Sequence, residues 1–403
     1  MPEPEGPLSG LRALDLTDEK GAYCGKLLGD LGADVIRVEP PGGPPTRRLG
    51  PFYQDQPNPE RSLSFWHYNT SKRGVTLNLE HPGGQELLCG LARRADLLIE
   101  SFAPGYLATL GLDYEPLSAL NQRLILVSIT PFGQSEPWAR YQGSDLVLQA
   151  LGGLMQVCGE KDTPPLMAFG GQSWHIGSCF GAISAMAALN RRRATGRGQH
   201  IDVSIEACIA GVLEHVNVWY FYSSNRIAER QGSLHWTNNF RVFRCQDGYI
   251  ATDIAARWDV LTAWLASESA AEDLLAEEWH DRRYRQEHVD RIIEVLQKWT
   301  ATKTVDELAA EGQLRRLPYG RVATVDRFLA NPQLNARGFF VSVPHPELGQ
   351  EFIYPGAPYK LTQSPWRIGR RAPLPGEHNR EVYCNDLGLS EQELARLQRE
   401  GVV

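Results

Sequence analysis

Residues 170–186, GGQSWHIGSCFGAISAM, bring an imidazole and a thiol close to the start of a run of small residues. Cys179 could act as a nucleophile and His175 as a base. However, Cys179 has helical spacing among Gly, Ala and Ser, which favours a buried, unreactive thiol. His175 in such a setting is more often a hydrogen-bonded structural residue. Trp174 directly precedes it and has no nucleophilic atom.

Three basic residues fall where a parallel sheet would bind a ligand. Arg37 lies in an expected strand at 34–41, and Lys72 and Arg73 precede another at 75–79. Ligands of open α/β sheets bind beyond the strand ends, so these cations could hold phosphate groups. From the residues alone, solvated surface cations are the simpler interpretation of Lys72 and Arg73.

Short apolar strands alternate with helices through the first 130 residues. Strands are expected at 11–16, 34–41, 75–79, 96–101 and 124–130, with helices at 21–33 and 85–95. The strand–helix–strand order implies right-handed parallel crossovers. The pattern predicts an α/β fold with an open, Rossmann-like parallel sheet.

The same pattern raises the possibility of a dinucleotide site. Glu39 ends the second strand, where an acid that binds a ribose would lie. The first turn, LTDEKGAYCG, lacks the GxGxxG sequence that cradles a pyrophosphate. The sequence therefore argues against NAD binding.

The pattern changes after residue 225. A hairpin is expected at 240–254 with its turn at Asp247-Gly248. Three helical patterns follow, and a β pattern begins near 336 before a final helix. Capping boxes are expected at Thr304 with Glu307 and at Ser390 with Glu393. These breaks divide the chain into 1–224, a small α/β domain at 225–335, and a C-terminal segment at 336–403.

The composition narrows the functional class. The chain has 403 residues, 42% of them hydrophobic and 22% charged, with a net charge of -7, which argues against a nucleic-acid binder. It contains no apolar run long enough to cross a membrane, and its first ten residues do not resemble a secretory signal. Seven scattered cysteines without a CxxC pair indicate reduced thiols. We expect a cytoplasmic protein.

Several stretches together carry a resemblance to a known family. They include LSGLRALDLT, LLGDLGADVIRVEPPGG, YNTSKRGVTLNL, ESFAPGYLATLGL, GSDLVLQALGGLM, ALNRRRATGRGQHIDVSIEA, NPQLNARGFFVSVPHPELG and PLPGEHNREV. In order and spacing they resemble the class III CoA-transferase family, which includes formyl-CoA, carnitine and benzylsuccinate CoA-transferases and α-methylacyl-CoA racemases. The resemblance implies a large domain completed by the C-terminal segment, and an interlocked dimer.

The resemblance also implies a substrate and its contacts. Coenzyme A or an acyl-CoA would be a substrate, with no covalently bound cofactor and no metal. The implied contacts are Arg37, Lys72, Arg73, Leu77, Asn78, Ser101, Phe102, Ala103, Gln142 and Asp145. Ser101 and Ala103 replace the family's usual Asn and Arg. Asp145 could instead cap the helix that follows it, which its residue type favours.

The family's transferases carry the acyl group on an aspartate, which forms a mixed anhydride and then a CoA thioester. That aspartate lies nine residues after the second proline of a Pro-Pro step and nine before a helical isoleucine. Counting from Pro165 and from Ile183 leads to Trp174. The glycine-rich loop that shields the intermediate also has no counterpart, because 251–260 contains no glycine. The racemase bases are absent too, since Ser144 replaces the histidine of GHD.

These departures predict a non-catalytic subunit. It would pair with a homologous chain that carries the aspartate, and would move CoA between carboxylic acids, for example from succinyl-CoA to an aromatic dicarboxylate such as benzylsuccinate. One alternative is an active homodimer with another nucleophile, such as Asp145 or Asp253 if the alignment is shifted. Another is a non-enzymatic acyl-CoA-binding protein.

Overall fold

The computed structural model describes residues 6–135, 137–230, 232, 234–235 and 240–403. It divides into two compact units. The first contains residues 1–154, 168–214 and 333–403, and the second contains 155–167 and 215–332. The sequence does not predict that 155–167 leaves the first unit, because no change of composition marks that segment.

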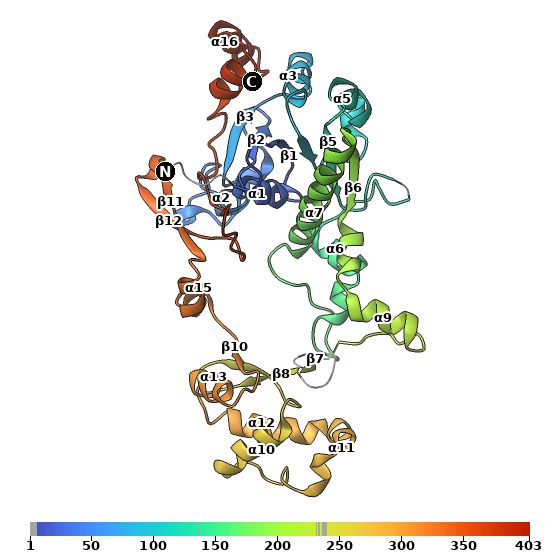
Figure 1. Ribbon diagram of the computed structural model, residues 1–403, viewed down its shortest axis with the longest axis vertical. Coiled ribbons are helices and arrows are strands. Elements are labelled where there is room, and N and C mark those ends of the chain that lie inside the picture. Colours follow the sequence, from blue (N-terminus) through green and yellow to red (C-terminus); the bar gives the residue numbers. More distant parts are fainter. Residues whose placement is uncertain (1–5, 136, 231, 233, 236–239) are drawn as a thin grey trace. The chain divides into compact units, whose positions relative to one another are not determined.

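The first unit is built on a six-stranded parallel sheet in the order β3-β2-β1-β4-β5-β6 (Figure 1). Its strands are β1 Arg12–Leu16, β2 Asp34–Glu39, β3 Lys72–Thr76, β4 Leu97–Glu100, β5 Ile125–Thr130 and β6 His200–Ser204. The predicted open parallel sheet is confirmed. The strand order reverses between β1 and β4, and a crevice at the carboxyl ends of the strands is expected there.

Helices cover both faces of this sheet. Side chains from alternate positions of each strand point to opposite faces, so each face forms a separate hydrophobic core with its helices. One face carries α3 Pro82–Ala92, α4 Tyr106–Thr109, α5 Tyr114–Leu120, the π-helix η6 Glu381–Asp386 and α16 Glu391–Arg399. The other face carries α1 Ala22–Asp30, α6 Asp145–Leu151, α7 Gln172–Thr195 and α8 Ile205–Gly211. A third, smaller core joins α2 Leu63–Tyr68 to the hairpin of β11 Phe340–His345 and β12 Gln350–Pro355.

Glycines let α7 lie close to α8 and to the sheet. A Cβ atom on Gly177 would lie 2.7 Å from the side chain of Ile205, the first residue of α8, and one on Gly181 would lie 2.7 Å from the side chain of Ile129 in β5. Both distances are shorter than side-chain packing allows, so a larger residue at either position would displace its neighbour. The run of small residues therefore serves the packing of α7 against α8 and the sheet.

The C-terminal segment returns to the first unit and covers the free edge of β3. The backbone N–H of His378 donates to the carbonyl oxygen of Gly74 at 2.9 Å, and that of Asn78 donates to Val402 at 2.8 Å. The last residues also enter the core beside α3. An edge strand with unpaired backbone groups invites pairing with other chains, and residues 370–403 prevent this.

The second unit contains an antiparallel sheet in the order β10-β9-β8-β7, and several helices. Its strands are β7 Leu234–His235, β8 Phe240–Arg244, β9 Tyr249–Asp253 and β10 Gly320–Arg321. Its helices are α9 Glu214–Tyr222, α10 Trp258–Ser267, α11 Arg282–Glu287, α12 Val289–Thr300, α13 Val305–Leu314 and α14 Val325–Leu329, and the chain returns to the first unit within α15 Pro332–Ala336. The hairpin and both capping boxes are confirmed. Within the described ranges, no helix has the length and apolar character needed to cross a bilayer.

Candidate functional site

A cavity of about 530 Å³ lies at the carboxyl ends of β1 to β4, where the strand order reverses. It is formed by residues that end or follow these strands, at 16–19, 37–40, 44–46, 77–80, 101–102 and 106. Five of the ten residues proposed as CoA contacts line it: Arg37, Leu77, Asn78, Ser101 and Phe102. The fold thus brings together residues from three separate segments of the sequence.

The loop after β4 is held by its own polar side chains. The Ser101 hydroxyl donates to Asp18 Oδ1 at 2.7 Å and accepts from the Asp18 N–H at 2.8 Å. The Phe102 ring lies 4.9 Å from that of Tyr106, and both face the cavity. Tyr106 was not predicted, although an aromatic residue four positions after Phe102 is compatible with a shared apolar wall.

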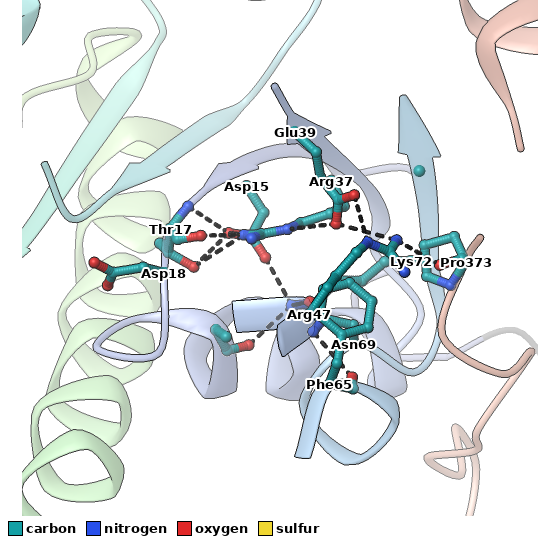
Figure 2. A network of polar contacts seen from close by, with 12 residues as sticks. Asp15, Thr17, Asp18, Arg37, Glu39, Arg47, Phe65, Asn69, Lys72 and Pro373 are labelled. Atoms are coloured by element: carbon teal, nitrogen blue, oxygen red, sulfur yellow. Dashed lines mark hydrogen bonds and ion pairs between the residues drawn. The ribbon is translucent and has the colours of Figure 1, made fainter. Parts of the chain in front are cut away.

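Beneath the cavity lies a network of buried charges, which Figure 2 shows. Arg37 Nη1 donates to Asp15 Oδ1 at 3.1 Å, and Lys72 Nζ donates to Asp15 Oδ2 at 2.7 Å. Arg47 Nε donates to Glu39 Oε2 at 2.8 Å. Burial alone would raise the pKa of Asp15, but the charges of Lys72 and Arg37 outweigh it and lower that pKa. Each of these cations has a carboxylate partner, and the ion pairs link β1, β2 and β3.

Lys72 and Arg73 do not line this cavity, contrary to expectation. They belong to β3, which begins three residues before the predicted 75–79, and they lie at its amino end. Lys72 is fully buried against Asp15. Arg73 forms ion pairs with Asp34 at 2.6 Å and with Asp386 at 2.9 Å. Both residues have protein partners, so neither is the solvated surface cation that the residues alone suggested.

Three other predicted contacts also lie outside the residues that line the cavity. Ala103 is exposed at the loop surface, and Gln142 is exposed before α6. Asp145 is the first residue of α6, whose N-cap is Ser144, with a hydroxyl that accepts from the Val147 N–H. The preference for Asp145 as the cap of α6 was therefore wrong by one residue.

The cavity has few groups that would bind a phosphate. Arg37 is the one basic residue among those that line it, against four acids: Asp18, Glu19, Glu39 and Glu80. Backbone N–H groups of the first turn already donate within the protein, among them those of Thr17 to Asp15 and of Gly21 to Asp18. The apolar side of the cavity, with Phe102 and Tyr106, is better suited to a flat ring than to a pyrophosphate.

Glu100, at the end of β4, was not singled out from the sequence. It is 4% exposed, and its Oε2 accepts from the Phe102 N–H at 2.8 Å. Burial raises its pKa from 4.5 to about 7, although hydrogen bonds from Ser128 and Phe102 oppose the shift. Its only signal in the sequence is an acid that ends an apolar strand.

We expect Glu100 to make stability fall as pH rises from about 4.5 to about 7. The raised pKa means that the folded state binds the proton more tightly, so ionisation costs folding free energy, in total roughly 3 kcal/mol. Glu100→Gln should flatten this slope and be more stable than wild type at pH 8, since the amide oxygen still accepts from Phe102. Urea denaturation across this pH range measures the effect. Parallel profiles for both proteins would contradict it.

The N-terminus of α7, which contains Trp174, is fixed by Asp145. Oδ1 of Asp145 accepts from the Ser173 N–H at 3.0 Å and from Gln149 Nε2 at 3.0 Å. The half-buried indole of Trp174 packs against the core shared by α7 and the sheet. Asp145 therefore caps α7, which is not the helix that it begins.

His175 and Cys179 have surroundings that suit structural roles. His175 Nδ1 lies 3.0 Å from the Gly171 carbonyl oxygen, which can only accept, so Nδ1 carries the proton. Nε2 is then left to accept from the Tyr68 hydroxyl at 3.0 Å. Burial raises the pKa of the Cys179 thiol, which disfavours the reactive thiolate.

The fold and the strand-end cavity define a doubly wound α/β protein with a ligand crevice at the switch point of its sheet. Residues 8–379 match the model of CoA-transferase family III, and the chain belongs to that family. It is 37% identical over 404 residues to the succinyl-CoA:(R)-benzylsuccinate CoA-transferase subunit BbsE of Thauera aromatica, covering 98% of both chains. It is 31% identical to a formyl-CoA:oxalate CoA-transferase of Streptomyces coelicolor, over 98% of this chain and 99% of that one.

Solved structures give the same result. A CAIB/BAIF family protein from Brucella suis superimposes with a TM-score of 0.85 at 30% identity, over 95% of this chain and 100% of that chain. The resemblance to class III CoA-transferases inferred from the sequence motifs is thereby confirmed.

Proposed function

We propose that this chain is the subunit of a heteromeric class III CoA-transferase that does not carry the acyl group. The observation on which this rests is the indole of Trp174 at the start of α7, where the family's spacing calls for an aspartate. The reaction needs a carboxylate that attacks the thioester carbonyl, expels the CoA thiolate and retains the acyl group as an anhydride. An indole has no atom that can do this.

Two other carboxylates of this chain, Asp145 and Asp253, are the alternative acyl carriers in place of the missing aspartate. Asp145 is near, because it binds the N–H of Ser173, but one of its oxygens already accepts two hydrogen bonds in capping α7. Asp253 accepts from the N–H groups of Ala255 and Ala256. Both carboxylates serve local structure, which favours a partner's carboxylate over an unconventional nucleophile in this chain.

An exposed apolar surface supports the presence of a partner subunit. On α7, Phe180, Ile183 and Met186 are spaced by three residues and lie on one face, and Ile183 is 63% exposed. The neighbouring helix α6 adds Leu146 and Leu151, each about half exposed. Apolar patches of this kind mark protein interfaces. We propose that a homologous chain with the family's aspartate covers this surface in an interlocked dimer.

For the substrates, we propose that an acyl-CoA donates CoA to a carboxylic acid. The strand-end cavity, with Leu77, Asn78, Ser101 and Phe102, would accept the adenine end of CoA against its apolar side. An aromatic dicarboxylate as the acid is supported by the similarity to BbsE, whose name refers to benzylsuccinate. BbsE is described as a subunit and is more similar to this chain than the formyl-CoA:oxalate CoA-transferase is, which favours a heteromer over a homodimer.

Mass spectrometry tests the proposal. The purified chain is incubated with succinyl-CoA, digested, and searched for succinyl or CoA adducts, alone and in complex with a homologous chain that carries the family's aspartate. We expect adducts only on the homologue's aspartate. An adduct on Asp145, or on another carboxylate of this chain, would establish a different nucleophile and refute the proposal.

A further inference from the structure

A second cavity, of about 300 Å³, lies within the first unit between the β11–β12 hairpin and the chain that follows it. It shares no lining residue with the strand-end cavity. Three aromatic rings and three basic side chains contribute to its wall, and the other lining residues are uncharged. These six residues are Phe339, Tyr359, Trp366, Arg337, Lys360 and Arg367.

Parts of this wall are fixed in place. The Trp366 ring lies so close to Gly356 that a Cβ atom there would be 2.1 Å from the ring, so only glycine allows this position. Arg337 donates from Nη2 to the Pro358 carbonyl oxygen at 3.0 Å, which holds its guanidinium beside the cavity. A ring and a cation are therefore already positioned without any ligand.

We propose that this cavity binds a small organic anion with a flat ring, of the class of aromatic carboxylates. Aromatic side chains favour contact with another ring, and Arg and Lys bind carboxylates through charge-assisted hydrogen bonds. Lys360 and Arg337 supply positive charge at the wall, and the lining residues include no acid, which favours an anion. The volume is at the lower end for small-molecule sites and suits one ring with its carboxylate. The proposal does not depend on whether the chain carries an acyl group.

Benzoate is the probe, and its affinity for the full chain is measured by NMR titration. We expect Lys360→Met to weaken binding about tenfold, because one charge-assisted contact is lost. Arg93→Met removes an exposed cation of the same unit that does not line the cavity, and should bind benzoate like wild type. Uncharged benzamide should bind wild type at least about tenfold more weakly than benzoate.

Ring contact is tested separately with cyclohexanecarboxylate, which keeps the charge without the flat ring and should bind more weakly than benzoate. Tyr359→Leu should reduce this preference, since it removes one aromatic wall. No binding of benzoate, or equal affinity in wild type and Lys360→Met, would overturn the proposal. So would an equal loss in Arg93→Met, because attraction would then depend only on the overall charge.

Discussion

Turnover by the assembled enzyme is expected to fall roughly a thousandfold or more when the partner subunit's aspartate, at the position equivalent to Trp174, is changed to asparagine. The amide cannot attack the thioester, so neither the anhydride nor the enzyme–CoA thioester forms. Steady-state transfer of CoA from succinyl-CoA to the acid acceptor measures the loss.

The matched control is Trp174→Phe in this chain, which keeps an apolar ring at the start of α7. It should leave turnover within a few-fold of wild type, because the proposed function places the acyl group on the partner and not on this chain. Full activity of the asparagine variant would place the chemistry in this chain. So would a large loss of turnover in Trp174→Phe. Trp174→Asp should not create a second active centre, since the glycine-rich loop is also missing from 251–260.

Lys72→Met is expected to destabilise the fold by about 3–5 kcal/mol. Lys72 is fully buried and donates to Asp15, to Asn69 and to the carbonyl oxygen of Ala22. Without it, Asp15 remains buried with less compensating charge. The change should appear as a lower urea midpoint with an unchanged slope.

Arg283→Met provides the comparison for this prediction. It also replaces a cation by Met and breaks an ion pair, with Glu287, but the Arg283 side chain is 86% exposed. Water screens such pairs, so its midpoint should be close to that of wild type. Equal shifts in the two variants would mean that the buried network contributes no more than a surface pair.

Local sequence patterns were sufficient to predict the sheet of the first unit. Alternating strands and helices in the first 130 residues implied parallel pairing, and strand ends are brought to one edge by that topology alone. This is why Leu77, Asn78, Ser101 and Phe102 meet in one cavity although up to 25 residues separate them in sequence.

The partners of the basic residues could not be predicted from local sequence patterns. Whether Lys72 faces a ligand or an acid depends on Asp15, which lies 57 residues away. Arg73 depends on Asp386, 313 residues further along the chain. Glu100 was missed for a related reason, because its raised pKa comes from burial by surrounding segments. The sequence shows which residues are charged, but their partners are set by the tertiary structure.

Residues 370–403 cover the free edge of β3, and this has a consequence for biosynthesis. A ribosome completes β3 long before it makes His378 and Val402, which form backbone hydrogen bonds with β3 and with Asn78 just after it. At roughly 5–20 residues per second, the interval is about 15–60 s. Throughout this interval the edge of the nascent sheet at β3 has no partner, so it is open to pairing with other chains until residues 370–403 have been made.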